Sequence, residues 1–204
     1  ENHKFKISVI VNNQNKYFYI SSNYKNFIKN LLATIAIISI FEDPLKLSKN
    51  IFYNFNVPKG RGDISKIKFM KKNIYLVDES YNSNPLSLKS AIENFDLIKT
   101  KNKKHVILGD MLELGKHSKA LHRQITPVIN LTSINQVNVY GNHIKETYKN
   151  ISSAKKGLIL KASSQINDLI KSKLNNNDYL MIKGSNSTGL NKFANKLKKI
   201  KNAL

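Results

Sequence analysis

Short apolar runs alternate with longer segments of helical periodicity from residue 66 to the end of the chain. Strands that alternate with helices of roughly ten to fifteen residues are typical of right-handed βαβ crossovers around a mostly parallel sheet. The sequence therefore predicts an α/β fold with a Rossmann-like domain, although the Gly-x-Gly-x-x-Gly dinucleotide fingerprint is absent. We expect strands at residues 66–69, 73–77, 105–108, 136–140, 157–160 and 178–182. We expect helices at residues 86–99, 116–129, 142–150, 163–173 and 190–200.

A turn-forming segment, Pro-Lys-Gly-Arg-Gly-Asp at residues 58–63, precedes this alternating pattern. One Pro and two Gly between periodic segments are typical of a turn or an interdomain linker. We therefore expect two parts, residues 1–61 and residues 62–204, joined by a linker that can act as a hinge.

The part before the linker begins with two strand-like runs, residues 4–11 and 16–20, which are separated by an Asn-rich hairpin turn. Residues 23–41 are apolar on most sides of a helix, which predicts a buried helix. A second helix is expected over residues 43–55, because its opening Asp-Pro pair combines an N-cap with a Pro at the first helical position.

The formal net charge is +21, but the lysines are spread along the whole chain. We interpret this charge mainly as solvated surface; the alternative, a basic nucleic-acid-binding module, predicts one concentrated basic stripe. The chain has no cysteine, which excludes disulfides and thiolate metal sites. Its longest apolar run, residues 31–41, is too short to cross a membrane, and the first residues lack the pattern of a signal peptide. A cytoplasmic protein without membrane insertion is therefore expected.

Three polar clusters come directly after predicted strands, at residues 78–84, 109–115 and 183–189. The carboxyl ends of parallel strands meet at one edge of the sheet, and α/β folds bind their ligands there. We therefore expect these three loops to lie along a common edge and to form a binding site.

The residues of the first cluster have functional and structural interpretations that the sequence leaves open. Asp78 could accept hydrogen bonds from two ribose hydroxyls, or it could cap its own loop. Tyr81 could stack on a ring of a ligand or pack within the protein. Asn82 and Asn84 could bind an amide or a carboxylate, but Asn before Pro85 is also ordinary turn chemistry.

The second and third clusters leave similar alternatives. The Lys183-Gly184-Ser185 turn could bind a carboxylate or phosphate ahead of a helix, or it could be a structural turn. It lacks the residue order of a Walker A loop. Asp110 and Glu113 could bind a metal ion, but a structural role is favoured.

Two histidines and one arginine complete the candidates. His117 and His122 lack the surroundings of metal ligands, so a surface or helix-packing role is expected for them. Arg61, in the linker, could reach a phosphate across the cleft between the two parts or remain a solvated charge.

Several motifs, in order along almost the whole chain, resemble the Mur ligase family and, within it, the MurF type. They are Asp-Glu-Ser-Tyr-Asn-Ser-Asn-Pro-x-Ser at 78–87, Gly-Asp-Met-x-Glu-Leu-Gly at 109–115 with His122 downstream, Lys-Gly-Ser at 183–185, Lys-Gly-Arg at 59–61 and Asn-Leu-Leu-Ala at 30–33.

The resemblance implies an ATP-dependent ligase of peptidoglycan precursor synthesis, which adds D-alanyl-D-alanine to UDP-N-acetylmuramoyl-tripeptide through an acyl phosphate. The family has three domains. This chain resembles only the end of the central ATPase domain, residues 1–61, and the C-terminal Rossmann-like domain, residues 62–204. The phosphate loop and the Mg²⁺ ligands are therefore expected upstream, and the fragment alone is expected to be inactive. The full-length protein is expected to be a monomer that binds no nucleic acid.

The resemblance also implies roles for individual residues. Asn30 would contact adenine, Arg61 would contact the ATP phosphates as the catalytic residue, and Asp78 would bind the ribose. Tyr81 is assigned to the nucleotide site and to the neighbouring dipeptide cleft. The residues expected to bind the dipeptide are Asn82, Asn84, Lys183, Gly184 and Ser185.

Two departures from the family pattern affect fine contacts: Asn26-Phe27 stands where many members have His before the helix Asn, and Asn186 stands where many have Arg.

An alternative function is a nucleotide-binding domain without catalysis.

Overall fold

The computed structural model describes residues 4–21, 28–54 and 58–200. The chain forms two compact units, Glu1–Pro58 and Lys59–Leu204. The predicted turn of Gly60, Arg61 and Gly62 therefore belongs to the second unit, and each unit is described separately below.

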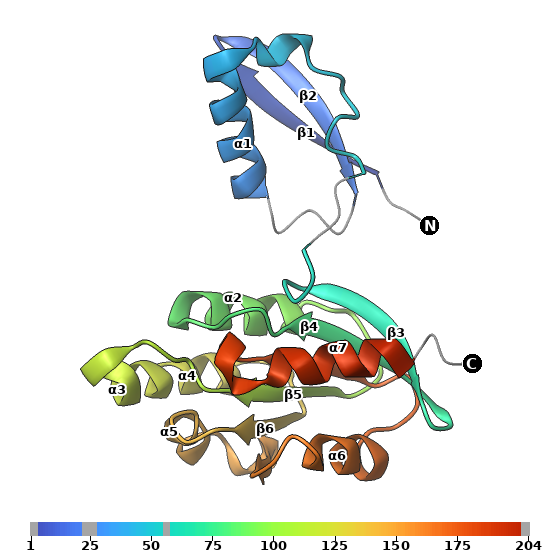
Figure 1. The fold of residues 1–204 in the computed structure, drawn as a ribbon, viewed down its shortest axis with the longest axis vertical. Helices are drawn as coiled ribbons and strands as arrows, with labels where there is room; N and C mark the ends of the chain where they lie inside the picture. Colours follow the sequence, from blue (N-terminus) through green and yellow to red (C-terminus); the bar gives the residue numbers. More distant parts are fainter. Residues whose placement is uncertain (1–3, 22–27, 55–57, 201–204) are drawn as a thin grey trace. The chain divides into compact units, whose positions relative to one another are not determined.

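The described residues of the first unit form an antiparallel hairpin, the helix α1 and a short 3₁₀ helix (Figure 1). Strands β1 (Lys4–Val11) and β2 (Gln14–Ser21) pair through a turn in which Asn12 and Asn13 have positive φ, as the Asn-rich hairpin pattern predicts. Helix α1 (Ile28–Phe41) confirms that the described part of this segment is helical; residues 23–27 of the prediction, with Asn26-Phe27, lie outside the described residues. The expected burial is wrong for the described part, because only Leu31 and Ile35 of α1 are buried and apolar side chains such as Ile40 and Phe41 are exposed. The core of this unit contains Phe18, Ile20, Leu31, Ile35 and Phe52.

The expected helix over residues 43–55 is wrong for the described residues to Asn54; Phe55 lies outside them. Asp43 does cap a helical turn, since its carboxylate accepts a hydrogen bond from Leu45 N, but only the 3₁₀ helix η2 (Pro44–Lys46) follows. The chain then turns, because the carbonyl of Lys49 accepts a hydrogen bond from Tyr19 N of β2 at 2.8 Å instead of a helical partner. Tertiary pairing thus overrides the local helical signal.

The second unit is built on a six-stranded sheet in the order β3-β4-β8-β5-β6-β7 (Figure 1). Strand β3 is antiparallel to β4, and the other neighbours are parallel, which confirms the expected mostly parallel α/β sheet. The strands are β3 (Asp63–Phe69), β4 (Lys72–Glu79), β5 (Lys104–Gly109), β6 (Gln136–Tyr140), β7 (Lys156–Leu160) and β8 (Tyr179–Lys183).

Helices cover both faces of this sheet, because successive strand residues point to opposite faces. Leu76 and Ile107 face a core with α6 (Gln165–Lys173) and α7 (Leu190–Ile200). Val77, Val106 and Leu108 face a second core with helices on the other side. The remaining helical elements are α2 (Pro85–Asp96), η3 (Gly115–His117), α3 (Ser118–Arg123), α4 (Ile125–Asn130), α5 (Lys145–Lys149), η4 (Ser153–Lys155) and η5 (Asn186–Thr188).

The prediction of a single helix over residues 116–129 is also wrong. In the structure this segment forms three short helices, η3, α3 and α4. The physical cause is Pro127. A continuous helix would need an N–H at this position for the carbonyl of Arg123, and the Pro ring would clash with that carbonyl. Helix α3 accordingly ends at Arg123, and both short helices still place buried side chains against the sheet. Within the described residues, none of the helices has the length and apolar character needed to cross a bilayer.

Candidate functional site at the carboxyl edge of the sheet

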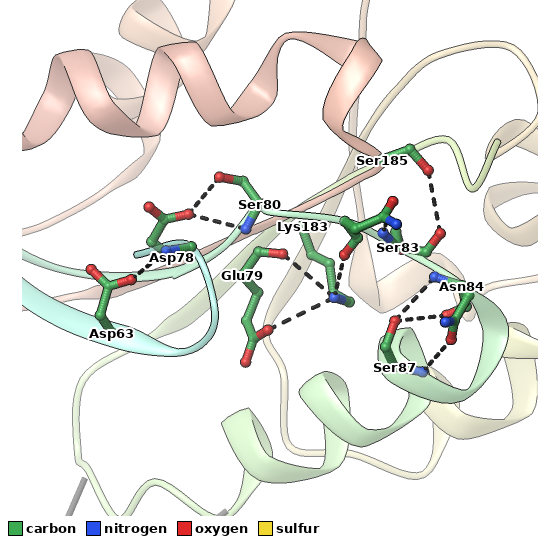
Figure 2. Close-up of polar contacts among 11 residues, drawn as sticks. Asp63, Asp78, Glu79, Ser80, Ser83, Asn84, Ser87, Lys183 and Ser185 are labelled. Carbon is green, nitrogen blue, oxygen red and sulfur yellow. Dashed lines mark hydrogen bonds and ion pairs between the residues drawn. The ribbon is translucent and has the colours of Figure 1, made fainter. Parts of the chain in front are cut away.

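The three polar loops meet at one edge of the sheet, as the sequence predicts, and Ser185 joins them. Its backbone N donates to the carbonyl of Asp110 at 2.9 Å. Its hydroxyl accepts a hydrogen bond from Leu112 N at 2.9 Å and donates one to the carbonyl of Ser83 at 3.3 Å (Figure 2). One buried serine after β8 therefore holds the loops after β4 and β5.

Two glycines allow these loops to approach so closely. A Cβ atom on Gly109 would lie 2.7 Å from Leu190 Cδ1 and 3.2 Å from the Cα of Gly184. A Cβ on Gly184 would lie 3.1 Å from the Cα of Gly109. The backbones of β5 and β8 are thus in contact where the two strands end, and a side chain at either position would push them apart.

Lys183 is almost fully buried, and its ammonium points into the loop after β4 (Figure 2). It donates to the carbonyl of Asn82 at 2.9 Å and to that of Glu79 at 3.4 Å, and the Glu79 carboxylate lies 3.7 Å away. Burial lowers the pKa of Lys183 and raises the pKa of Glu79, so for both groups desolvation outweighs their mutual attraction. The main structural effect of Lys183 is therefore to hold the backbone of residues 79–82.

The carboxylate of Asp78 is buried and already has partners in this chain. One oxygen accepts from Ser80 N at 3.0 Å and from the Ser80 hydroxyl at 2.5 Å (Figure 2). The other oxygen lies 2.5 Å from the ammonium of Lys198, on α7. The structure thus gives Asp78 the loop-capping role that was one of its two interpretations, and a direct contact with a ribose stays a prediction.

Arg61 lies in a tight turn that is attached to the same loop. Gly60 and Gly62, on either side of it, have φ values of +77° and +94°, which favour glycine. Tyr81 N donates to the carbonyl of Gly60 at 3.0 Å, and Gly62 N donates to that of Asp78 at 2.7 Å. The exposed guanidinium of Arg61 lies over the Tyr81 ring, 4.4 Å from its centroid, in a cation–π contact.

The two asparagines of the first cluster have local structural partners. Asn84 is the N-cap of α2 and forms a reciprocal capping box with Ser87 (Figure 2). The side-chain oxygen of Asn82 accepts from Ser83 N at 2.8 Å. Capping explains Asn84 fully, whereas Asn82 is exposed and lines a cavity.

This cavity, of about 160 Å³, opens where the three loops meet. Its lining comes from Tyr81, Asn82, Leu112, Glu113, Ser185, Asn186 and Ser187. Because polar side chains and backbone groups dominate its wall, it can take a small polar ligand. Ser83, just behind this wall, has a buried hydroxyl without a hydrogen-bond partner.

Asp110 anchors the loop after β6. Its carboxylate accepts from Ile144 N at 2.7 Å and from Asn142 N at 3.0 Å. Gly141 has φ +130°, and a Cβ there would lie 2.4 Å from this carboxylate. These contacts support the structural interpretation of Asp110. Glu113 is exposed, and no group of three or more potential metal-ligating His, Cys, Asp or Glu residues occurs among the residues that the structure describes.

The imidazole of His122 fixes the loop after β5, which agrees with the expected packing role. It is fully buried, its Nε2 accepts from Met111 N at 3.0 Å, and its Nδ1 donates to the carbonyl of Ser118 at 2.7 Å. Burial lowers the pKa of His122, which favours this neutral tautomer. His117 is exposed.

Asn30 lies in the first unit, on α1, with an exposed side chain. Its carbonyl accepts from the Thr34 hydroxyl, as expected within a helix. Its contact with adenine stays a prediction.

Sequence reasoning missed Lys198, which pairs with Asp63 and Asp78. A signal was present, because Lys198 borders the apolar stripe of α7 formed by Leu190, Ala194 and Leu197. The signal is weak, because exposed lysines stand near Lys198 in the same helix and the sequence does not distinguish it from them.

Residues 66–186, more than half of the chain, match the family described as Mur ligase, glutamate ligase domain. The chain belongs to this Mur ligase family. The matched region begins within β3 and ends after the Lys183-Gly184-Ser185 turn, so it includes the first two loops of the site and the start of the third.

Relatives of this Mur ligase chain include two proteins named UDP-N-acetylmuramoyl-tripeptide–D-alanyl-D-alanine ligase. The one from Rickettsia prowazekii is 27% identical over 168 residues, which cover 82% of this chain and 36% of the relative. The one from Buchnera aphidicola subsp. Acyrthosiphon pisum is 31% identical over 171 residues, or 83% of this chain and 36% of the relative. The chain thus spans little more than a third of their length.

The fold of this Mur ligase chain is similar to that of the MurF ligase from Thermotoga maritima, whose crystal structure was solved in complex with ADP. The TM-score is 0.73 at 18% identity, with 97% of this chain and 44% of that chain covered. A MurF structure from Acinetobacter baumannii gives a TM-score of 0.72 at 18% identity, with 95% and 42% covered. These likenesses concern the fold.

Proposed function

We propose that this chain is the C-terminal part of an ATP-dependent ligase that joins D-alanyl-D-alanine to UDP-N-acetylmuramoyl-tripeptide in peptidoglycan precursor synthesis. The observation that carries the proposal is the meeting of three loops through Ser185 at the carboxyl edge of the sheet. The common name of the relatives supports it. In this proposal residues 1–61 belong to a central ATPase domain and residues 62–204 form the C-terminal domain.

Arg61 is the group of this chain that we assign to the nucleotide phosphates. ATP, when bound, supplies the phosphoryl group that activates the tripeptide carboxylate for attack by the amine of the dipeptide. An exposed guanidinium, held over Tyr81 in a turn with fixed backbone, suits charge neutralisation at a phosphate. Asn30 and Asp78 are assigned to adenine and ribose as before, and no Mg²⁺ ligand is assigned to this chain.

The cavity between the loops is our candidate for the dipeptide site. Tyr81, Asn82 and Ser185 line it, so an amide and a carboxylate find donors and acceptors there. Lys183 holds the loop after β4 through the carbonyl of Asn82, and Gly184 allows the close approach to Gly109 that brings the loops together. Asn84 contributes indirectly in this proposal, because it caps the helix α2 that follows the loop after β4. In this proposal these residues bind the dipeptide and orient its amine toward the activated carboxylate. Holding the two reactants in the right geometry lowers the barrier to their reaction.

The binding part of the proposal is tested by adding D-alanyl-D-alanine to the ¹⁵N-labelled chain and following its amide signals. We expect the signals of Asn82, Leu112 and Ser185 to move, and L-alanyl-L-alanine to have a weaker effect. Tyr81→Ala should weaken the response. An equal response to both dipeptides, or one confined to other residues, would contradict the site.

The reaction is tested in the natural protein that contains this sequence. Release of inorganic phosphate should require UDP-N-acetylmuramoyl-tripeptide and D-alanyl-D-alanine together, and Arg61→Ala should reduce kcat. ATP binding without any such release would favour the alternative of a nucleotide-binding domain without catalysis. Tight, salt-sensitive binding to random DNA would favour a basic nucleic-acid-binding module.

A further inference from the structure

We propose that Lys198 is a positioning residue, which holds the turn of Arg61 and the loop of Asp78 in one fixed arrangement. The effect on Arg61 rests on the proposed function, in which Arg61 meets the nucleotide phosphates. The arrangement itself depends only on contacts within the second unit.

Lys198 neutralises two carboxylates that the sheet places opposite each other. Asp63 on β3 and Asp78 on β4 are direct partners in the antiparallel register. Like charges in this position repel and destabilise a sheet. The ammonium of Lys198 lies 2.5 Å from an oxygen of each, and it reaches them from α7, which packs against β3. The distant end of the chain thus supplies the charge that this strand pair needs.

The same two carboxylates hold the backbone around Arg61. The second oxygen of Asp63 accepts from Gly60 N at 2.7 Å. The second oxygen of Asp78 accepts from Ser80, and its carbonyl accepts from Gly62 N. Each aspartate therefore has one oxygen on Lys198 and the other on the turn or the loop. Loss of Lys198 releases both carboxylates to rotate and weakens their bonds to Gly60 N and to Ser80.

Other charges near the cluster do not replace Lys198. Glu79, next to Asp78, adds a third carboxylate. Lys183, which lies near it, is engaged with the carbonyls of Glu79 and Asn82. Burial lowers the pKa of Lys198, but its hydrogen bonds to Asp63 and Asp78 outweigh burial and raise this pKa above its usual value. The ammonium therefore stays charged through the neutral range.

The test compares three variants of the full 204-residue chain by amide hydrogen exchange and by pH titration of NMR signals. Lys198→Met should speed exchange by about tenfold or more at Gly60 and Ser80, whose amides donate to the two carboxylates. Lys196→Met, which removes an exposed lysine of the same helix, should leave both amides unchanged. Lys198→Arg, which keeps the charge, should restore protection.

The pH profile separates positioning from simple loosening of the helix. Two carboxylates without a cation favour uptake of a proton. In Lys198→Met, the signals of Gly60 and Gly62 should therefore shift with pH at a higher pH than in the unchanged chain. If Lys198→Met does not fold, Asp63→Asn/Lys198→Met removes one charge of each sign, and faster exchange at Ser80 is the expected result. Unchanged exchange at Ser80 in whichever variant folds would overturn the proposal.

A final comparison separates this proposal from the proposed function. In the natural protein, Lys198→Met and Arg61→Ala should each lower kcat, and the double variant should lose little more than either, because both act through one guanidinium. If Arg61→Ala has no effect while Lys198→Met still speeds exchange at Gly60 and Ser80, the assigned role of Arg61 fails and the positioning role stands. Fully additive losses would show that Lys198 does not act through Arg61.

Discussion

Substitution of Gly141 by Ala should lower the free energy of unfolding of the second unit by more than the cost of placing Ala at a positive φ. The residue has φ +130°, and the new Cβ would lie 2.4 Å from the Asp110 carboxylate. That carboxylate is buried and accepts from the backbone N of Asn142 and of Ile144. It cannot move away without losing these bonds.

The expected magnitude follows from two contributions. An unfavourable φ costs about 1–2 kcal/mol for a residue with a Cβ. Hydrogen bonds to a charged group contribute about 1.5–3 kcal/mol each, so losing both costs about 3 kcal/mol or more. We expect Gly141→Ala to lose about 4 kcal/mol or more. The control is Gly189→Ala, at φ +79° with open space around its Cβ, which should lose only about 1–2 kcal/mol.

The assay is hydrogen exchange of the buried β5 amides under native conditions, because their slowest opening reports the free energy of unfolding of the second unit. Asp110→Ala should already be destabilised, and adding Gly141→Ala to it should cost no more than Gly189→Ala does. Equal losses for Gly141→Ala and Gly189→Ala in the unchanged background would refute the reasoning, since the clash with Asp110 would then have no energetic effect.

Three further changes test other contacts of the site. Ser185→Ala should lose about 1–3 kcal/mol in the same assay, because Leu112 N is left without its acceptor. Asn84→Ala should lose about 1 kcal/mol through the cap of α2, and Asn84→Asp, which keeps a cap, should be nearly neutral; a large effect on dipeptide binding alone would contradict the capping role. Burial lowers the pKa of His122, so the unfolded chain takes up the proton first and stability should fall as the pH drops below about 6.5. His122→Gln should reduce that dependence in acid unfolding followed by circular dichroism, whereas His117→Gln, at an exposed site, should leave it unchanged.

The sequence predicts the sheet and the edge on which the loops meet, because apolar runs followed by polar clusters depend on local order alone. The capping residues Asp43 and Asn84 were recognisable for the same reason, since a cap is read from neighbouring residues. The break of the helix at Pro127 could have been predicted, because a Pro within a helical pattern ends the helix before it. The lost helix after Lys46 could not, because the bond from Tyr19 N to Lys49 joins distant residues.

The contacts of the site depend on the same distant pairings. That Ser185 joins three loops, or that Lys198 reaches Asp63 and Asp78, follows from the sheet order and from the path of α7. Neither is contained in the spacing of residues along the chain. The buried partners of Asp78 also show why a carboxylate at a strand end, taken alone, leaves its role open.

The close backbone contact between Gly109 and Gly184 limits which residues can be varied to change what the cavity between the loops binds. A Cβ at either position would press on Leu190 and on the facing glycine, so substitutions there would shift the two strand ends and reduce stability. The positions to vary are instead Leu112, Glu113 and Asn186, which line the cavity. They lie outside the strands, and they take part in no buried ion pair among the described residues.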